Sequence, residues 1–296
     1  HAVLDIVRGT NKVLYAETTS SEQTINAQTF NSDGYDLVQD AGANSINSNA
    51  SAKVAWSWKA NGVGATNEDG SINTIKTSAN TTSGFSIVKY QGTGSNATVG
   101  HGLGVAPRMI IVKSLGTNNW SVYHGSLGGT KAIFMDITSG SATHVDYWNN
   151  TNPTSSVFSI GISSNMNHSG TDMIAYCFAE KKGFSKFGSY VGNGNVDGTF
   201  VHLGFKPTWL LIKRTSASGD QWQLSDSKRG FNGAIKTLYT DSAEVETSSD
   251  SIDHLSNGFK NRATSVARNG SGSDYIYMAF AEEPLVSTNG TPATAR

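Results

Sequence analysis

Residues whose types and spacing could carry out catalysis are few in this chain. Asp253 and His254 lie beside a Ser-rich stretch, and nucleophilic catalysis by a triad needs serine, histidine and an acid brought together in space. No Gly-x-Ser-x-Gly motif joins a predicted strand to a predicted helix, although that motif is the usual local sign of a hydrolase nucleophile. The sequence therefore predicts no catalytic triad, and we expect a protein that is not an enzyme.

Acidic residues leave one enzymatic alternative open. Cleavage of a glycosidic bond needs two carboxyl groups about 5–10 Å apart across a groove. Glu180 and Glu282 lie at matching ends of two similar segments, which favours a structural role such as capping a turn. Glu244, Glu246 and Asp250 lie in a predicted loop. A polysaccharide-degrading enzyme remains the alternative function.

No pattern of ligands predicts a metal site or a cofactor. His101 and His202 occur near matching positions of the two similar segments, which favours packing or turn roles. The chain has no His-x3-His motif and no cysteine pair, so zinc is not expected. Loops rich in Asn, Asp and Gly suit Ca²⁺, but tight turns need the same residues. The prediction is no cofactor and no metal, with Ca²⁺ left open.

One short segment has the composition of a glycan-binding site. Tyr147 and Trp148 precede Asn149 and Asn150 in a predicted loop. Aromatic faces stack on sugar rings, and amides pair with hydroxyl groups. The other interpretation is that Trp148 plugs the end of a β-sandwich, where its ring would fill the core.

Composition excludes several classes of protein. Charged residues make up 15% of the 296 residues and the net charge is −1, so the clustered positive charge that nucleic-acid binding needs is missing. The pairs Lys213-Arg214 and Lys228-Arg229 are interpreted as solvated loop charges. Cys177 is the one cysteine, so no internal disulfide is possible. No apolar run approaches the ~20 residues of a membrane-spanning helix, and we expect no membrane insertion.

An internal repeat is the main feature of the sequence. Two segments, 84–113 and 183–213, begin with Gly-Phe-Ser and continue through a Leu-Gly-x-x-Pro motif to an apolar run that ends in lysine. Both repeats close alike, with residues 174–180 and 276–282. A bounded apolar run predicts a strand covered on both faces, and the residues between such runs are rich in turn formers.

The closing segments predict strands with two unlike faces. Because successive side chains of a strand point to opposite faces, one face carries large residues and the other small ones. The large residues are Val54, Trp56, Trp58, Ile174, Tyr176, Phe178, Ile276, Met278 and Phe280. Cys177 falls on the small face, where we expect a buried apolar role. The small faces would allow close approach by a second sheet or by another subunit.

The expected fold is all-β, built from tandem antiparallel β-sandwich or jelly-roll-like repeats of about 100 residues. The expected organisation is a partial repeat at 1–60 (the first unit), a linker at 61–82, repeats at 83–182 (the second unit) and 183–283 (the third unit), and a polar tail at 284–296. The sequence predicts that the first unit begins midway through a repeat, since Asp5–Gly9 matches Asp226–Gly230 midway through the third unit. We favour an upstream continuation; a degenerate first copy is the alternative.

The repeat resembles a known family at several motifs. These are Gly183-Phe-Ser-Lys-Phe-Gly-Ser-Tyr190, Gly204-Phe-Lys-Pro-Thr-Trp-Leu-Leu-Ile-Lys-Arg-Thr215, Ala279-Phe-Ala-Glu282, Asp5-Ile-Val-Arg-Gly9 and Pro153-Thr-Ser-Ser-Val-Phe158. They are similar to an uncharacterised repeated β domain of structural, tail-fibre-like virion proteins from tailed, often marine, bacteriophages. The family brings no established activity, so the resemblance implies no functional residue.

The resemblance and the composition together predict a virion structural protein. It would be tail-fibre-like or a decoration or adhesion protein, assembled in the host cytoplasm as an oligomer, most simply a homotrimer, with loops that bind the host surface. The expected partners are further copies, other virion proteins and a host glycan. A secreted or virion-borne polysaccharide-degrading enzyme and a cellular adhesin are the alternatives.

Overall fold

Antiparallel sheets make up nearly all of the regular structure. The computed structural model describes residues 1–25, 28–38, 46–48, 52–230, 232–249 and 251–281. These residues form 23 strands and two one-turn helices, and the paired strands are antiparallel in each ladder. This confirms the expected all-β class.

The second unit is built on a seven-stranded sheet with the order β12-β11-β10-β9-β14-β7-β6. A two-stranded sheet, β13-β8, lies with it. The elements are β6 (Lys76–Asn80), β7 (Phe85–Gln91), β8 (Ala97–Gly100), β9 (Met109–Ser114), β10 (Ser121–His124), β11 (Lys131–Phe134), β12 (Ala142–Thr143), α1 (Val145–Trp148), β13 (Val157–Ile160), α2 (Ser164–Asn167) and β14 (Asp172–Phe178).

The third unit has a six-stranded sheet with the order β15-β23-β17-β18-β19-β20 and a three-stranded sheet, β16-β22-β21. Its strands are β15 (Ser185–Val191), β16 (Phe200–His202), β17 (Trp209–Arg214), β18 (Gln223–Asp226), β19 (Ile235–Tyr239), β20 (Thr247–Ser249), β21 (Ile252–Leu255), β22 (Gly258–Asn261) and β23 (Asp274–Phe280). The order of strands in this large sheet matches that of the second unit, in which the corresponding strands are β7, β14, β9, β10, β11 and β12. The register agrees too, because Met109 lies opposite Phe178 and Trp209 lies opposite Phe280.

The first unit contains less sheet. It has a three-stranded sheet, β1-β2-β3, and a separate hairpin, β4-β5. The strands are β1 (Ala2–Val3), β2 (Lys12–Tyr15), β3 (Gln23–Thr24), β4 (Gln28–Phe30) and β5 (Tyr35–Leu37). The predicted closing strand at Val54–Trp58 is wrong as a paired strand, since these residues belong to no ladder. The predicted alternation holds, because Trp56 and Trp58 are half-buried whereas Ala55 and Ser57 are exposed.

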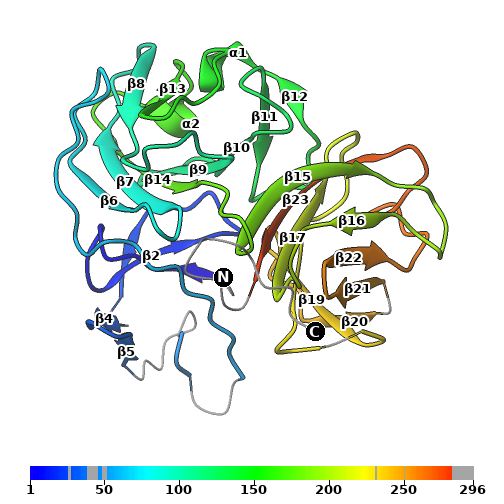
Figure 1. Ribbon diagram of the computed structural model, residues 1–296. Coiled ribbons are helices and arrows are strands. Elements are labelled where there is room, and N and C mark those ends of the chain that lie inside the picture. Colours follow the sequence, from blue (N-terminus) through cyan, green and yellow to red (C-terminus); the bar gives the residue numbers. More distant parts are fainter. Residues whose placement is uncertain (26–27, 39–45, 49–51, 231, 250, 282–296) are drawn as a thin grey trace.

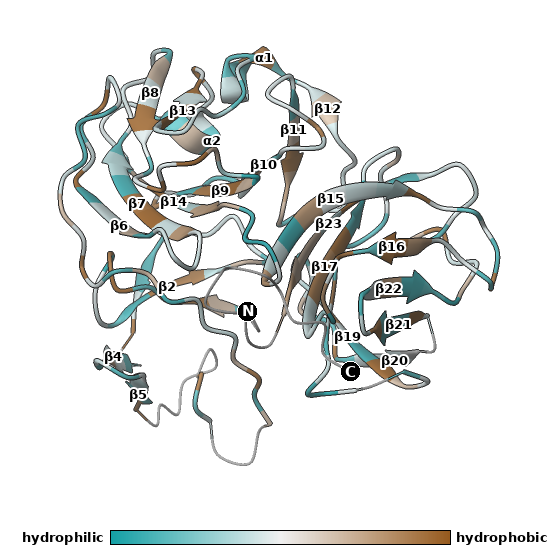
Figure 2. Cartoon of the chain, viewed as in Figure 1, coloured by the Kyte–Doolittle hydropathy of each residue, from teal (hydrophilic) through white to brown (hydrophobic). Residues whose placement is uncertain are grey.

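The large faces of the two big sheets meet in one core. Ile174, Tyr176 and Phe178 share a buried cluster with Ile276, Met278 and Phe280, to which Val7 and Leu14 also belong. Figure 1 shows β2 below the second-unit sheet, with the third-unit sheet beside them, and Figure 2 shows apolar stretches along β9, β14, β17 and β23. The core therefore joins all three units.

In the second and third units, the small faces are covered by the chain's own second sheets. Ala175 and Cys177 pack with Val99 and Phe158 from β8 and β13, and Ala279 packs with Phe259 of β22 and its neighbours. The sequence left open whether a second sheet or another subunit covers the small faces, and in these two units a second sheet covers them. The small residues of β14 and β23 are already buried within the chain, so they are not available for subunit contacts, whereas Ala55 and Ser57 of the first unit are exposed.

Three aromatic rings at equivalent positions meet where the units join. Trp58, Phe178 and Phe280 contact one another, with ring centroids 6.2, 5.5 and 6.1 Å apart. Edge-to-face and tilted contacts of this kind stabilise a core beyond the area that they bury. The three units are thus arranged around a common centre.

Hydrogen bonds join each of the three units to a neighbouring unit. Each unit reaches the next through one ring nitrogen that pairs with a main-chain carbonyl. These bonds are Trp120 Nε1 to Tyr15 O (3.1 Å), Trp222 Nε1 to Phe134 O (2.7 Å) and His1 Nε2 to Ser242 O (2.9 Å). Trp120 and Trp222 are each 1% exposed, so both rings lie in the core.

Residues 61–82, predicted as a linker, contain β6, which pairs with β7 at the edge of the second-unit sheet. Ile72 adds to the core behind that sheet. The buried Ser78 in this stretch accepts from Asn61 N and donates to Gly62 O. The predicted tail at 284–296 lies outside the described residues.

Candidate functional site

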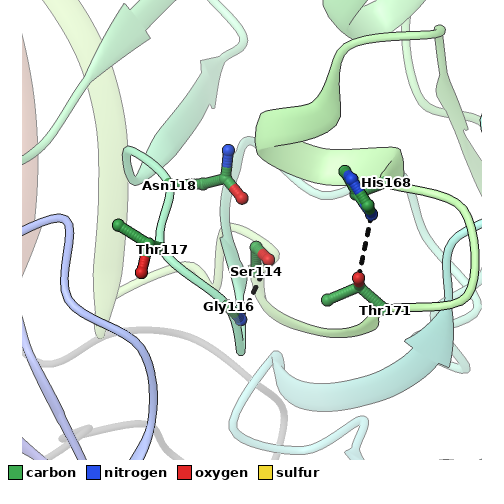
Figure 3. A pocket seen from close by; sticks show the side chains of 6 residues that line it. All are labelled: Ser114, Gly116, Thr117, Asn118, His168 and Thr171. Atoms are coloured by element: carbon green, nitrogen blue, oxygen red, sulfur yellow. Dashed lines mark hydrogen bonds between the residues drawn. The ribbon is translucent and has the colours of Figure 1, made fainter.

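A polar pocket lies in the second unit, between the loop after β9 and the loop before β14. It is lined by Ser114 at the end of β9, by Gly116, Thr117 and Asn118 after that strand, and by His168 and Thr171, which precede β14. Figure 3 shows the two segments facing each other across the pocket. The volume is about 320 Å³, at the lower end of the range for small-ligand sites.

The walls of the polar pocket are held by local hydrogen bonds. Gly116 N donates to Ser114 Oγ (3.1 Å), and His168 Nδ1 pairs with Thr171 Oγ1 (2.9 Å). Asn118 Nδ2 donates to Asn165 Oδ1 (3.2 Å). These bonds fix the side chains that line the pocket before any ligand arrives.

The buried Lys113 fixes the loop that forms one wall. Its ammonium donates to the carbonyls of Gly116 (3.0 Å) and Asn118 (2.7 Å), and also to Thr19 O of the first unit (3.2 Å). Burial lowers the pKa of Lys113 to about 8. Lys113 and its bonded carbonyls thus tie the pocket to the boundary between units.

Lys213 is a second buried lysine bonded to a main-chain carbonyl, and the prediction that it is a solvated loop charge is wrong. Its ammonium donates to the carbonyl of Asp220. Burial lowers its pKa to about 8. Arg229 also has a fixed place, because its Nε pairs with Asp226 Oδ2 at 2.6 Å.

Several polar atoms of the pocket remain available to a ligand. Within the described part of the chain, no hydrogen bond reaches Thr117 Oγ1, Asn118 Oδ1 or His168 Nε2. The lining contains no carboxylate and no Phe, Tyr or Trp side chain. Such a surface can bind hydroxyl groups through hydrogen bonds, but it offers no acid–base pair for hydrolysis.

The predicted glycan-binding segment has a different environment. Trp148 lies on α1, is 1% exposed and packs edge-to-face against Tyr123 (5.6 Å). Tyr147 is half-buried, and its hydroxyl accepts from Asn165 Nδ2 (2.8 Å). Trp148 therefore fills the core, as the alternative interpretation predicted, and has no free face on which a sugar could stack.

The two asparagines of that segment form a turn. Asn149 and Asn150 both have φ of 49°, a left-handed conformation that asparagine tolerates better than most residues. Asn149 ends α1 and its side-chain oxygen accepts from Asn96 Nδ2 (3.2 Å). Only Asn150 is exposed, so the four predicted residues do not form one continuous binding surface.

The candidate catalytic residues do not form a triad. His254 Nε2 lies 3.3 Å from Ser225 Oγ, but Asp253 points to the opposite side of β21 and pairs with Arg262 (2.5 Å). Ser225 and His254 are each 2% exposed, so a substrate cannot reach them. Burial lowers the pKa of His254 to about 4, which keeps the ring neutral.

The other predicted ligands and acids are dispersed. His101 is buried and His202 is exposed. Glu282 and Asp250 lie outside the described residues, so the Glu180–Glu282 pair and the 244–250 loop cannot be assembled into a site. Among the described residues, no three His, Cys, Asp or Glu side chains gather as a metal site.

Two buried asparagines, Asn167 and Asn269, are not among the residues predicted from the sequence. Asn167 bonds main-chain groups of Thr93 and Gly161, and Asn269 bonds Asn193 N and Ala263 O in the equivalent place. Both are 0% exposed. Each asparagine stands two residues before a Ser-Gly pair that leads into the closing strand. This repeated position is the sequence feature that could have identified them. They brace the loops beside the strands, and Asn167 does so next to the polar pocket.

Comparison with known proteins gives one match. A family model described as a domain of unknown function (DUF7483) matches residues 1–284. No curated protein and no solved structure matches the chain. Among the described helices, neither has the length and apolar character needed to cross a membrane.

Proposed function

We propose a function for a chain that belongs to the DUF7483 family: it serves as a structural and adhesion protein of a bacteriophage virion, tail-fibre-like or decorating in role. The observation that carries the proposal is the way the units are joined. Their large faces share one core, and ring nitrogens bond carbonyls of neighbouring units. Such a body holds its outer loops rigidly, as attachment to a surface requires. The resemblance of the repeat to virion proteins supports the proposal that the chain belongs to a virion.

The polar pocket is the proposed site of attachment. Its free hydroxyl, amide and imidazole atoms suit a neutral, hydroxyl-rich ligand, and hydrogen-bonding groups set the specificity of such sites. We assign it a host-surface glycan as ligand. The lack of an aromatic wall implies modest affinity for one sugar, which repeated copies would raise by multivalency.

Assembly as a homotrimer is part of the proposal. Val191, Val196 and Phe200 are large apolar residues that are 54%, 64% and 43% exposed on the third unit, and contact with another copy would remove them from water. Sedimentation equilibrium at micromolar concentration should give three times the chain mass. A strict monomer would contradict this part.

The attachment site is tested by titrating oligosaccharides from host capsule and lipopolysaccharide into the wild-type protein and pocket variants. Thr117→Val and His168→Ala each remove one free polar atom and should lower the affinity about tenfold, the equivalent of one charged or well-placed hydrogen bond. Thr82→Val, an exposed threonine outside the pocket, is the matched control and should bind normally.

Two outcomes count against the proposal. Equal binding by all three variants would place the glycan elsewhere. Release of shortened oligosaccharides from the polysaccharide would instead support the alternative of a polysaccharide-degrading enzyme.

A further inference from the structure

Asn118, which lines the polar pocket, has a counterpart in the third unit. The buried Lys113 donates to Asn118 O, and the buried Lys213 donates to Asp220 O. Asn118 and Asp220 each stand two residues before the buried tryptophan of their unit. A neutral amide in the second unit therefore takes the place of a carboxylate in the third.

Ser114 at the floor of the pocket has a counterpart as well. Ser114 and Arg214 directly follow the two buried lysines and end β9 and β17. Their partners in the ladders, Met173 and Tyr275, hold matching places on β14 and β23. A short hydroxyl side chain in the second unit therefore takes the place of an arginine in the third.

In the third unit a guanidinium spans the space between these two positions. Arg214 Nη1 lies 3.0 Å from Asp220 Oδ2, and the two side chains are 20% and 13% exposed. In the second unit Ser114 and Asn118 stand at the same positions and line the polar pocket of about 320 Å³. The third unit thus shows the kind of group that this space accommodates, which is small, planar and polar.

The charges around the pocket favour a neutral group. Lys113 Nζ lies behind one wall, bonded to Gly116 O and Asn118 O, and the lining has no carboxylate. In the third unit, by contrast, Asp220 neutralises the guanidinium. A cation in the second-unit pocket would lose hydration without gaining a counter-charge, which is costly.

The free polar atoms of the pocket are two acceptors and a hydroxyl group. His168 Nδ1 lies 3.2 Å from Ser169 O. Because a carbonyl only accepts, the ring proton lies on Nδ1, and Nε2 is left as an acceptor. Asn118 Oδ1 is the second acceptor, and the Thr117 hydroxyl can donate. A group with one N–H and one carbonyl matches this set.

We infer that the polar pocket binds the acetamido group of an N-acetylated amino sugar. An acetamido group has a planar carbon with three heavy-atom substituents, as a guanidinium has, but carries no charge. Its N–H can donate to Asn118 Oδ1 or His168 Nε2, and its carbonyl can accept from the Thr117 hydroxyl. This ligand class rests on the proposed function, since it names the kind of sugar that the attachment site selects.

The ligand class is tested by titrating three monosaccharides onto the full chain, with binding followed by saturation-transfer NMR. N-acetylglucosamine carries the acetamido group, glucosamine has an ammonium group at the same carbon, and glucose has a hydroxyl there. N-acetylglucosamine should bind at least about tenfold more tightly than the other two, because they lack the amide hydrogen bonds. Its acetamido methyl protons should receive the largest saturation.

Grafting the third-unit pair into the second unit tests the location. Ser114→Arg combined with Asn118→Asp fills the pocket with a guanidinium and a carboxylate but leaves Thr117 and His168 in place. This double variant should no longer bind N-acetylglucosamine, whereas Thr82→Val, an exposed position outside the pocket, should bind it normally. If the double variant does not fold, Asn118→Ala removes one acceptor and should weaken binding about tenfold.

The possible outcomes separate this ligand class from the proposed function. Host oligosaccharides that bind while N-acetylglucosamine binds no better than glucose would overturn the acetamido assignment alone. Tighter binding of glucosamine would overturn it by showing that the pocket takes a cation. Normal binding by a folded double variant, or by Asn118→Ala, would place the acetamido group outside the pocket. Failure of every sugar and host oligosaccharide to bind would overturn the proposed attachment site as well.

Discussion

Burial keeps the His124 ring neutral, and its main-chain partners fix which ring nitrogen carries the proton. His124 Nε2 lies 3.1 Å from Tyr277 O of the third unit, and Ser126 N donates to His124 Nδ1 (3.2 Å). Because the carbonyl can only accept and the amide can only donate, these partners place the single proton on Nε2. Burial lowers the pKa of His124 to about 4, and the nearby Arg108 acts in the same direction.

The pKa of His124 predicts a loss of stability in acid. Between pH 6.5 and 4 the unfolded chain binds a proton at this residue and the folded chain does not, so the stability contributed by the neutral ring falls as the pH falls. His124→Gln keeps a donor for Tyr277 O but cannot titrate. Over this range the wild-type protein should lose about 3 kcal/mol more than the variant, as measured by urea unfolding at each pH.

The comparison isolates His124 from other titrating groups. His254 contributes with the same sign, whereas burial raises the pKa of Asp241 to about 6 and so contributes with the opposite sign; both are common to the two proteins. His202→Gln, at an exposed position, should follow the wild-type curve. Parallel curves for wild type and His124→Gln would contradict the prediction.

At the scale of the element, Val54–Trp58 shows that side-chain packing can hold an extended segment without a ladder. The Trp58 ring lies 5.4 Å from that of Trp209 and 5.5 Å from that of Phe280. Arg229 lies over the ring of Trp56 at 5.4 Å, a distance at which cation–π attraction operates. The segment therefore connects the second and third units through its aromatic side.

Removal of the Trp58 ring should destabilise the whole chain. Trp58→Ala opens a cavity among the three equivalent rings, and we expect a loss of about 2–3 kcal/mol, below the range for a fully buried tryptophan because the residue is only half-buried. The free energy of unfolding in urea measures the loss. Ser57→Ala, on the exposed side of the same segment, should change stability by less than about 0.5 kcal/mol. Similar losses for the two variants would show that the ring cluster does not stabilise the junction.

At the scale of the whole molecule, the units share a core instead of having separate ones. One buried cluster includes residues from β2, β9, β14, β17 and β23. Main-chain bonds add to it, since Ser141 N donates to Thr215 O (3.0 Å) and Glu22 N donates to Leu115 O (2.9 Å) at matching places. Unfolding of one unit would therefore expose apolar surface on its neighbours.

This shared core predicts a single thermal transition. Differential scanning calorimetry should give a calorimetric enthalpy equal to the van't Hoff enthalpy. Trp222→Phe removes the indole N–H that bonds Phe134 O between units and should lower stability by about 1 kcal/mol without splitting the transition. Two separate endotherms in the wild-type protein would indicate units that unfold independently.

The sequence by itself determined which residues share a face and where the main strands lie. The apolar runs that end in Lys113 and Lys213 appear as the strands β9 and β17, and the alternation at 174–180 places its large residues together on β14. Tertiary structure decided what covers each face, because alternation is local whereas the covering residues are distant in sequence. For the same reason the sequence leaves two interpretations of Trp148 open and predicts a paired strand at Val54–Trp58. It gives no sign of the polar pocket, which is built from two loops about fifty residues apart.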